Sequence, residues 1–258
     1  MNTIKPSIFL TFDLEEFDIP LEFNQPISHE LQMEIGKKGL DIISIILKQH
    51  DINCTLFTTG SFAQCFPDAL RELSLKHEIA SHSLSHSSFK KTDVINSKIL
   101  LENITGQKIK GFRMPRMKSI NIDWLKEAGY LYDASINPIF MPSRYNNLNL
   151  PRKIYYDNDF LRVPCSVSPN LRIPLFWLSF KNIPYALYKK IALQTLKKDG
   201  YLSLYFHPWE FTDINNFNLP FYIKRISGPQ LQSNLNRLIQ DLKSHAIFNT
   251  IGSLIKNN

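Results

Sequence analysis

The feature that most constrains this chain is a repeated alternation of short apolar segments with longer amphipathic ones. Residues 8–12 read as a strand, and residues 30–49 follow with apolar side chains at roughly helical spacing. Repeats of this β-then-α kind predict a parallel sheet with helices outside it, arranged as a barrel or as a doubly wound sheet. A length of 258 residues, of which 43% are hydrophobic, is enough for one such domain over residues 1–258.

The same reasoning assigns the other elements. Strands are expected at residues 8–12, 53–59, 78–81, 110–113, 130–134, 160–163, 201–206 and 246–249. Helices are expected at residues 30–49, 68–76, 93–104, 122–128, 184–199 and 229–244, with Thr92 or Asp93 capping the helix at 93–104. Residues 138–159, rich in Pro, Asn, Arg and Tyr, are expected to form an irregular loop on the substrate side. Active-site residues of such folds follow the carboxyl ends of the strands.

Two polar clusters at strand ends carry potential metal ligands. Asp13 and Glu15 end the first strand, and side chains two positions apart on a strand face the same side. Two carboxylates aimed into one pocket favour a bound cation or a raised pKa, although a pair of exposed loop acids would have the same sequence. His82 and His86 follow the strand at 78–81. On a helix this spacing would place both imidazoles on one face, where they could bind one metal ion, but surface histidines at this spacing also occur by chance.

Two further clusters supply a cation and a proton donor. Arg113 ends the strand at 110–113 and offers a donor fork suited to a carboxylate, unless it lies in an exposed basic turn. His207 ends the apolar strand at 201–206 and suits a general acid. Trp209 could pack flat against a sugar ring or could simply be buried in the core. Competing motifs are absent from the sequence, which has no G-x-S-x-G elbow, no G-x-G-x-x-G fingerprint and no P-loop.

Taken in order, these clusters resemble the motif series of the NodB-homology polysaccharide deacetylases, carbohydrate esterase family four. The matching stretches are Thr11-Phe12-Asp13, His82-x-x-x-His86, Arg113-x-Pro115 and Leu204-x-x-His207. A branch found in loci for exopolysaccharides and surface glycans is closer still, through stretches such as Tyr132-Asp133-x-Ser135 and His207-Pro208-Trp209-Glu210. The resemblance covers nearly the whole chain.

The resemblance implies a distorted (β/α)7 barrel that holds one divalent metal ion, expected to be Zn²⁺, and that removes an N-acetyl group from an amino sugar. It assigns the roles of general base, orienting residue and general acid to Asp13, Arg113 and His207. It assigns metal binding to His82 and His86. Contacts with the substrate are expected from Trp209, Pro115 and Asp133, and Asp133 could also polarise a catalytic histidine.

One position departs from the family pattern. The first motif usually has two adjacent aspartates, the second of which binds the metal, but that position is Leu14 here. Relatives with an acid two positions after the first aspartate resemble this chain, and strand geometry agrees, so Glu15 is expected to be the third ligand. Glu16 is the alternative.

Two other functions stay open at this point. Related barrels with a His-Pro-Trp-Glu-like segment include allantoinase-type enzymes, so the chain could hydrolyse a cyclic amide or ureide. It could also be a catalytically silent barrel that binds glycans. The presence of Asp13, both histidines, Arg113 and His207 argues against a silent barrel, because binding alone needs no acid–base pair.

Charge and terminal sequence suggest where the chain acts. A net charge of +7 favours anionic partners, but the basic residues are dispersed, and no nucleic-acid partner is expected. The five apolar residues near the N-terminus are too few for a signal-peptide core, so we expect a cytoplasmic protein whose substrate is a nucleotide-linked or lipid-linked N-acetylated sugar. The apolar residues 173–180 could rest on an anionic membrane surface, although burial against the barrel is the simpler explanation.

Overall fold

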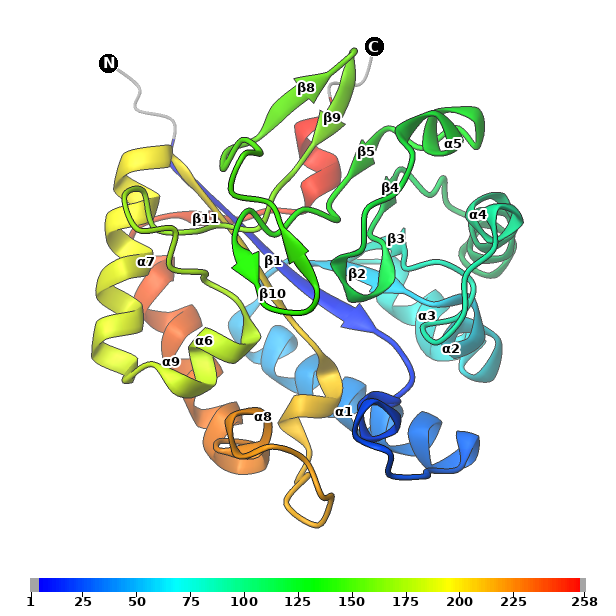
Figure 1. Cartoon of the computed structure of the whole chain (residues 1–258), viewed down its shortest axis with the longest axis horizontal. Helices are drawn as coiled ribbons and strands as arrows, with labels where there is room; N and C mark the ends of the chain where they lie inside the picture. Colours follow the sequence, from blue (N-terminus) through cyan, green and yellow to red (C-terminus); the bar gives the residue numbers. More distant parts are fainter. Residues whose placement is uncertain (1–4, 256–258) are drawn as a thin grey trace.

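A curled sheet forms the centre of the computed structural model, which describes residues 5–255 (Figure 1). The order of its strands is β10-β1-β2-β3-β4-β5-β9-β8, and β11 also pairs with β1. All pairs are parallel except β8 with β9. The strands are β1 (Ser7–Leu14), β2 (Thr55–Thr58), β3 (Glu78–Ser81), β4 (Gly111–Phe112), β5 (Tyr132–Asp133), β8 (Tyr155–Asp157), β9 (Phe160–Arg162), β10 (Tyr201–Phe206) and β11 (Ile247–Phe248). The expected distorted β/α barrel, a single mixed α/β domain, is confirmed.

Helices cover the outside of the sheet, with α7 beside β10, with α9 beside α1 and α7, and with α3 and α4 beside β3 (Figure 1). The helices are α1 (His29–His50), α2 (Gly60–Cys65), α3 (Pro67–Ser74), α4 (Lys91–Thr105), α5 (Ile122–Glu127), α6 (Trp177–Asn182), α7 (Tyr185–Asp199), α8 (Phe221–Lys224) and α9 (Gly228–Lys243). The ends of α4 and α7 are closed by Gly106 and Gly200, which adopt φ values of 70° and 80° in the left-handed region. Among the described residues, no helix combines the length and the apolar composition needed to cross a bilayer.

The two-residue period of β1 decides what faces the inside of the barrel. Leu10 and Phe12 pack into the core between the sheet and the helices. Phe9 instead packs with Phe57 in a smaller cluster on the other face of the sheet. Asp13 shares the parity of Phe9, so the alternation carries its carboxylate to the inner face, where β1 ends.

Several boundaries differ from those expected. Helix α4 begins at Lys91, and Lys90 is its N-cap, so the assignment of Thr92 or Asp93 as the cap was wrong. The Asp93 carboxylate instead accepts a hydrogen bond from the Lys90 backbone N–H at 2.7 Å, as an acidic residue in the first turn of a helix can do.

The region expected to be an irregular loop is partly ordered into strands. Residues 138–159 contain the hairpin of β6 (Phe140–Met141) and β7 (Tyr145–Asn146), and they also contain β8. The apolar segment at 173–180 enters α6, where Trp177 and Phe180 are buried against the barrel. Burial therefore accounts for its apolar character.

Candidate active site

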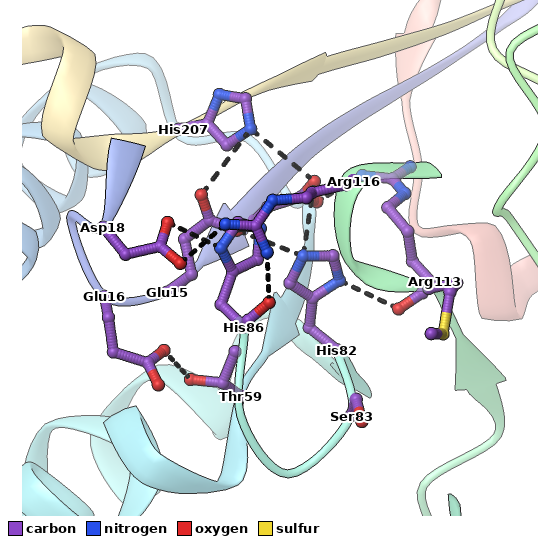
Figure 2. A network of polar contacts seen from close by, with 12 residues as sticks. Glu15, Glu16, Asp18, Thr59, His82, Ser83, His86, Arg113, Arg116 and His207 are labelled. Carbon is purple, nitrogen blue, oxygen red and sulfur yellow. Dashed lines mark hydrogen bonds and ion pairs between the residues drawn. The ribbon is translucent and has the colours of Figure 1, made fainter. Parts of the chain in front are cut away.

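The carboxyl ends of β1, β3, β4 and β10 meet at one cavity. Its volume is about 190 Å³, and its lining includes Asp13, Glu15, His82, His86 and His207. These residues lie far apart in the sequence, and the parallel arrangement of their strands brings them to the same edge of the sheet. Figure 2 shows the three histidines turned toward the acidic residues that follow β1.

Two imidazoles and one carboxylate converge in this cavity. Glu15 Oε2 lies 3.1 Å from His82 Nε2 and 3.0 Å from His86 Nε2. Each of the three residues offers a ligand atom, and these atoms all lie within 4.8 Å of one another. Two nitrogen donors and one oxygen donor at this separation suit a divalent transition metal with an open coordination position.

The other nitrogen of each imidazole is held by the protein. His82 Nδ1 lies 2.9 Å from the Arg113 carbonyl oxygen, which can only accept a hydrogen bond. His86 Nδ1 lies 2.8 Å from Asp18 Oδ1. A hydrogen on each Nδ1 leaves each Nε2 free to bind a metal, and such outer contacts are the usual support of metal-binding histidines.

The path of the chain between the two histidines is not helical. Helix α4 starts only at Lys91, and Ser83 has a φ of 66°, in the left-handed region. The imidazole rings of His82 and His86 nevertheless stack, with centroids 5.6 Å apart. The two rings are therefore brought together by the path of a loop and not by the helical spacing that the sequence suggested.

A buried arginine fixes the position of Asp13. Arg113 Nη1 donates to Asp13 Oδ1 at 2.5 Å and to Thr11 Oγ1 at 2.9 Å, and the guanidinium lies 3.9 Å from the ring centroid of Phe57. Burial alone would lower the pKa of Arg113, but the Asp13 carboxylate outweighs it and raises that pKa. The second oxygen, Asp13 Oδ2, stays 3.9 Å from His82 Nε2 and faces the cavity.

His207 approaches the acidic residues from the opposite side. Its Nε2 lies 4.0 Å from Asp13 Oδ2 and 3.8 Å from Glu15 Oε1. Its Nδ1 lies 3.0 Å from Glu210 Oε1, and its ring stacks on Trp209 with centroids 4.9 Å apart. Glu210 and Trp209 therefore hold the His207 ring in place, and Nε2 is the nitrogen that faces the cavity.

Mutual charge stabilisation dominates the electrostatics of the metal-free site. Burial would raise the pKa of Glu15, but His86, His207 and His82 outweigh it and hold that pKa far below its usual range. Burial would likewise lower the pKa of His86, but Glu15 and Asp18 raise it to about 9. The pKa of His207 is raised in the same way, since Glu15 and Glu210 outweigh its burial. The cavity thus favours cationic charge next to Glu15, whether that charge is a proton or a metal ion.

Other expected residues lie outside this convergence. Glu16, the alternative ligand, accepts from Thr59 Oγ1 at 2.7 Å and points toward α2 (Figure 2). Asp133 is buried and pairs with Arg162 at 3.0 Å, away from His207. Pro115 is buried at the start of the turn after Arg113 and is not part of the cavity lining. Trp209 does line the cavity, but it is only 2% exposed, and its indole N–H donates to Glu15 Oε1 at 3.2 Å.

Three residues with evident roles in this geometry had not been singled out as site residues. Asp18 holds His86, and Arg116 donates to Asp18 Oδ2 at 2.9 Å and to the His86 carbonyl oxygen at 2.6 Å. Glu210 holds His207. The signal for Glu210 was present in the sequence, three positions after His207 and two after Pro208, whereas the contact of Asp18 depends on the path of a loop.

Comparison with protein families gave a match over the first half of the chain. The polysaccharide deacetylase family matches residues 1–131, a stretch that contains Asp13, Glu15, His82, His86 and Arg113 but ends before His207. Comparison with curated proteins gave no match.

Solved structures share the fold over nearly the whole chain. A protein from Mycobacterium smegmatis described as a polysaccharide deacetylase is 17% identical, with a TM-score of 0.65, over 98% of this chain and 90% of that one. An allantoinase is 16% identical, with a TM-score of 0.65, over 96% of this chain and 88% of that one. A Bacillus anthracis pseudoenzyme of carbohydrate esterase family four is 14% identical, with a TM-score of 0.53, over 98% of this chain and 66% of that one. At these identities the likeness is one of fold.

One barrel fold therefore carries proteins described as a deacetylase, as an allantoinase and as a pseudoenzyme. The family match extends over more than half of the chain and includes the residues around β1, β3 and β4. The chain belongs to the polysaccharide deacetylase family, the NodB-homology group of carbohydrate esterase family four.

Proposed function

We propose that this chain is a metal-dependent hydrolase that removes an N-acetyl group from an amino sugar in a glycan or a glycan precursor. In this proposal residues 1–258 act as one barrel, Glu15, His82 and His86 hold the metal, Asp13 is the general base and His207 is the general acid. Family membership supports deacetylation as the reaction class. The identity of the sugar and the assignment of each residue are our proposal.

The observation that carries the proposal is the convergence of His82 Nε2 and His86 Nε2 on one oxygen of Glu15, at 3.1 and 3.0 Å. Both imidazoles are buried and their Nδ1 atoms are already engaged, so Nε2 is the nitrogen that each can offer to an ion. The donor set fits a divalent ion, and we propose Zn²⁺, which commonly takes two histidines and one carboxylate in hydrolases. Such an ion supplies Lewis-acid activation of water and of the acetyl carbonyl group.

Asp13 is placed to take a proton from the attacking water. Its Oδ1 is held by Arg113, so Oδ2 is the oxygen free to accept that proton inside the cavity. The ion pair with the guanidinium thereby fixes which oxygen of Asp13 faces the cavity. Arg113 therefore acts through Asp13, as a positioning residue.

His207 is placed to donate a proton to the leaving nitrogen. An amide nitrogen must gain a proton before it departs as an amine, because expulsion as an anion is prohibitively slow in water. His207 Nε2 faces the cavity from the side opposite His82, and the Glu210 carboxylate 3.0 Å from Nδ1 favours the protonated ring that this step needs. The base and the acid thus reach the same small cavity from different strands.

The experiment is metal analysis and N-deacetylation of a chitooligosaccharide by the native chain and three variants. We expect His82→Ala to lose both metal and activity, and His207→Ala to keep the metal and lose activity. His245→Ala, which removes an exposed histidine outside the site, is the matched control and should change neither. A fully active His207→Ala would disprove the assignment of the acid.

Allantoin and a chemically acetylated nucleotide-linked sugar are the comparison substrates. Release of acetate from the amino sugars alone supports the proposal. Turnover of allantoin in place of acetate release would assign a ureide hydrolase to this barrel, and metal binding without any turnover would assign a silent, glycan-binding role.

A further inference from the structure

A fully buried lysine lies behind the proposed general acid. Lys181, on α6, is 1% exposed, and its Nζ lies 3.2 Å from Glu210 Oε2, which belongs to a residue that is 0% exposed. The ammonium group sits between two indole rings, 5.6 Å from the centroid of Trp177 and 5.9 Å from that of Trp209. Both indoles line the cavity, whereas Lys181 is not one of its lining residues.

The two oxygens of Glu210 serve different partners. Oε1 accepts from the His207 backbone N–H at 2.8 Å and lies 3.0 Å from His207 Nδ1. Oε2 faces Lys181. Among residues 5–255, neither Oε2 nor Lys181 Nζ has a hydrogen-bond partner besides this ion pair. A continuous line of contacts therefore runs from Lys181 through Glu210 to the ring whose Nε2 faces Asp13.

We propose that Lys181 is a positioning residue for the reaction: by pairing with Glu210 it keeps that carboxylate an acceptor, so that His207 carries a hydrogen on Nδ1 and turns Nε2 to the substrate. This inference rests on the proposed role of His207 as the general acid. Lys181 itself touches no reacting atom.

The argument turns on what Glu210 would do without the cation. A fully buried carboxylate without a cation beside it is costly, and it escapes that cost by taking up a proton. With its proton on Oε1, Glu210 becomes an O–H donor, and Nδ1 of His207 then accepts. The ring hydrogen would move to Nε2, giving a neutral imidazole with no proton to spare for a leaving amine.

Stability alone gives no reason for the pair. Buried ion pairs can often be replaced by apolar residues of similar volume without loss of stability, because desolvation offsets the attraction between the charges. A leucine or methionine at 181 facing an apolar residue at 210 would fill this core equally well. The lysine is instead matched to the one carboxylate that orients the cavity histidine, which points to a role in the reaction.

The first test compares two substrates of the metal-loaded Lys181→Met variant. For an N-acetyl sugar we expect kcat to fall by about 10²-fold with KM nearly unchanged, because a positioned general acid contributes about 10²–10⁴-fold. For 4-nitrophenyl acetate, whose phenolate leaves without needing a proton, we expect kcat to change by less than about threefold. An equal loss on both substrates, or no loss on either, would overturn the inference.

The second test reads the ring of His207 without reference to activity. In ¹⁵N-histidine-labelled protein, with the His207 signal identified by its loss in His207→Ala, we expect the neutral ring of the native chain to carry its hydrogen on Nδ1. In Lys181→Met we expect the hydrogen to shift toward Nε2, and retention on Nδ1 would contradict the proposal. If the native chain deacetylates nothing, the proposed function fails, but this measurement still decides the role of Lys181.

A double variant guards against simple misfolding of the single one. In Lys181→Met with Glu210→Gln the neutral carboxamide oxygen accepts from Nδ1 without any cation nearby. We expect it to recover at least about tenfold of the kcat lost in Lys181→Met and to restore the Nδ1 hydrogen. A folded double variant as impaired as the single one, on the N-acetyl substrate and in the ring signal, would show that the lysine acts in some other way.

Discussion

Glu15 and Glu78 are two glutamates at opposite ends of one curled sheet. Glu78 begins β3, and its oxygens accept from Thr55 Oγ1 at 2.8 Å, Tyr132 Oη at 2.9 Å and the Gly252 N–H at 2.8 Å. Glu15 follows the end of β1, and its neighbours are the imidazoles of His82, His86 and His207 together with the Trp209 N–H. The Glu78 carboxylate is thus surrounded by neutral donors, and the Glu15 carboxylate is surrounded by titratable imidazoles.

This difference separates a carboxylate with structural contacts from the one that we propose as a metal ligand. Burial raises the pKa of Glu78 even though its three donors act in the other direction, and its contacts tie the C-terminal segment of the described chain to β2, β3 and β5. The histidines around Glu15 outweigh its burial and lower its pKa. Neutral donors occupy the acceptor sites of a carboxylate oxygen. Imidazoles whose Nε2 atoms are free can instead bind an ion together with the carboxylate.

The largest expected effect comes from Glu15→Gln. The change keeps the shape of the side chain but removes the charge that balances an ion between His82 and His86, so we expect loss of bound metal. Activity should fall by more than the roughly 10²–10⁴-fold that removal of an acid or a base costs. Metal analysis and acetate release measure both, and a variant that retains stoichiometric metal would show that Glu15 is not a ligand.

His207→Ala should have the next largest effect and should leave the metal in place. We expect kcat for an N-acetyl sugar to fall by about 10²–10⁴-fold, because the leaving nitrogen loses its proton donor. Asp13, Glu15 and His207 form a second group whose ligand atoms lie within 4.8 Å of one another, but our proposal assigns the metal to Glu15, His82 and His86, so metal content should match that of the native chain. Loss of metal in this variant would place His207 among the ligands instead.

Asp18→Asn tests the support behind a ligand. The Asp18 carboxylate holds His86 Nδ1 at 2.8 Å. Neutralising it should weaken metal affinity by about 10–100-fold, as is typical when an outer contact of a ligating histidine is lost. Titration with a competing chelator measures this change, and an unaltered affinity would mean that the loop alone orients His86.

Metal affinity should depend on pH with a defined sign. In the metal-free chain His86 has a pKa of about 9, so an ion must displace its proton at any lower pH. Affinity should therefore rise by up to about tenfold per pH unit and level off near pH 9. Asp18→Asn should move the plateau to lower pH, because one of the two carboxylates that raise the pKa is gone; an affinity independent of pH would contradict this account.

Glu78→Gln should have the smallest effect on activity and is the counterpart of Glu15→Gln. One amide N–H₂ group would face a hydrogen-bond donor, which should lower the free energy of unfolding by about 1–3 kcal/mol. The folded variant should keep its metal and its kcat. Urea unfolding and acetate release measure the two quantities, and a large loss of kcat in folded protein would erase the distinction between the two ends of the sheet.

Sequence reasoning reached the residues that meet at the cavity because strand ends are visible in the apolar pattern. Asp13 lies next to the last residue of β1, and His82, Arg113 and His207 each follow a strand directly. Parallel strands end at one edge, and Arg113 reaches the cavity through its bond to Asp13. Their catalytic roles stay predictions. The fold and the convergence of these side chains could thus be predicted from the sequence alone.

The supporting contacts were less accessible because they depend on loops. Asp18 reaches His86 only because the chain after β1 and the chain after β3 bend toward each other, and Arg116 joins them from a left-handed conformation with a φ of 57°. Lys181 lies in a six-residue helix that has no clear periodic signal in the sequence. No local pattern links position 181 to position 210, so their ion pair emerges only from packing.

The most direct test of the central claim is anomalous diffraction from crystals of the metal-loaded chain, recorded at the absorption edge of the bound ion. We predict one peak in the cavity, coordinated by a carboxylate oxygen of Glu15 and by Nε2 of both His82 and His86. A peak that lies elsewhere, or a cavity without a peak in protein that carries stoichiometric metal, would contradict it.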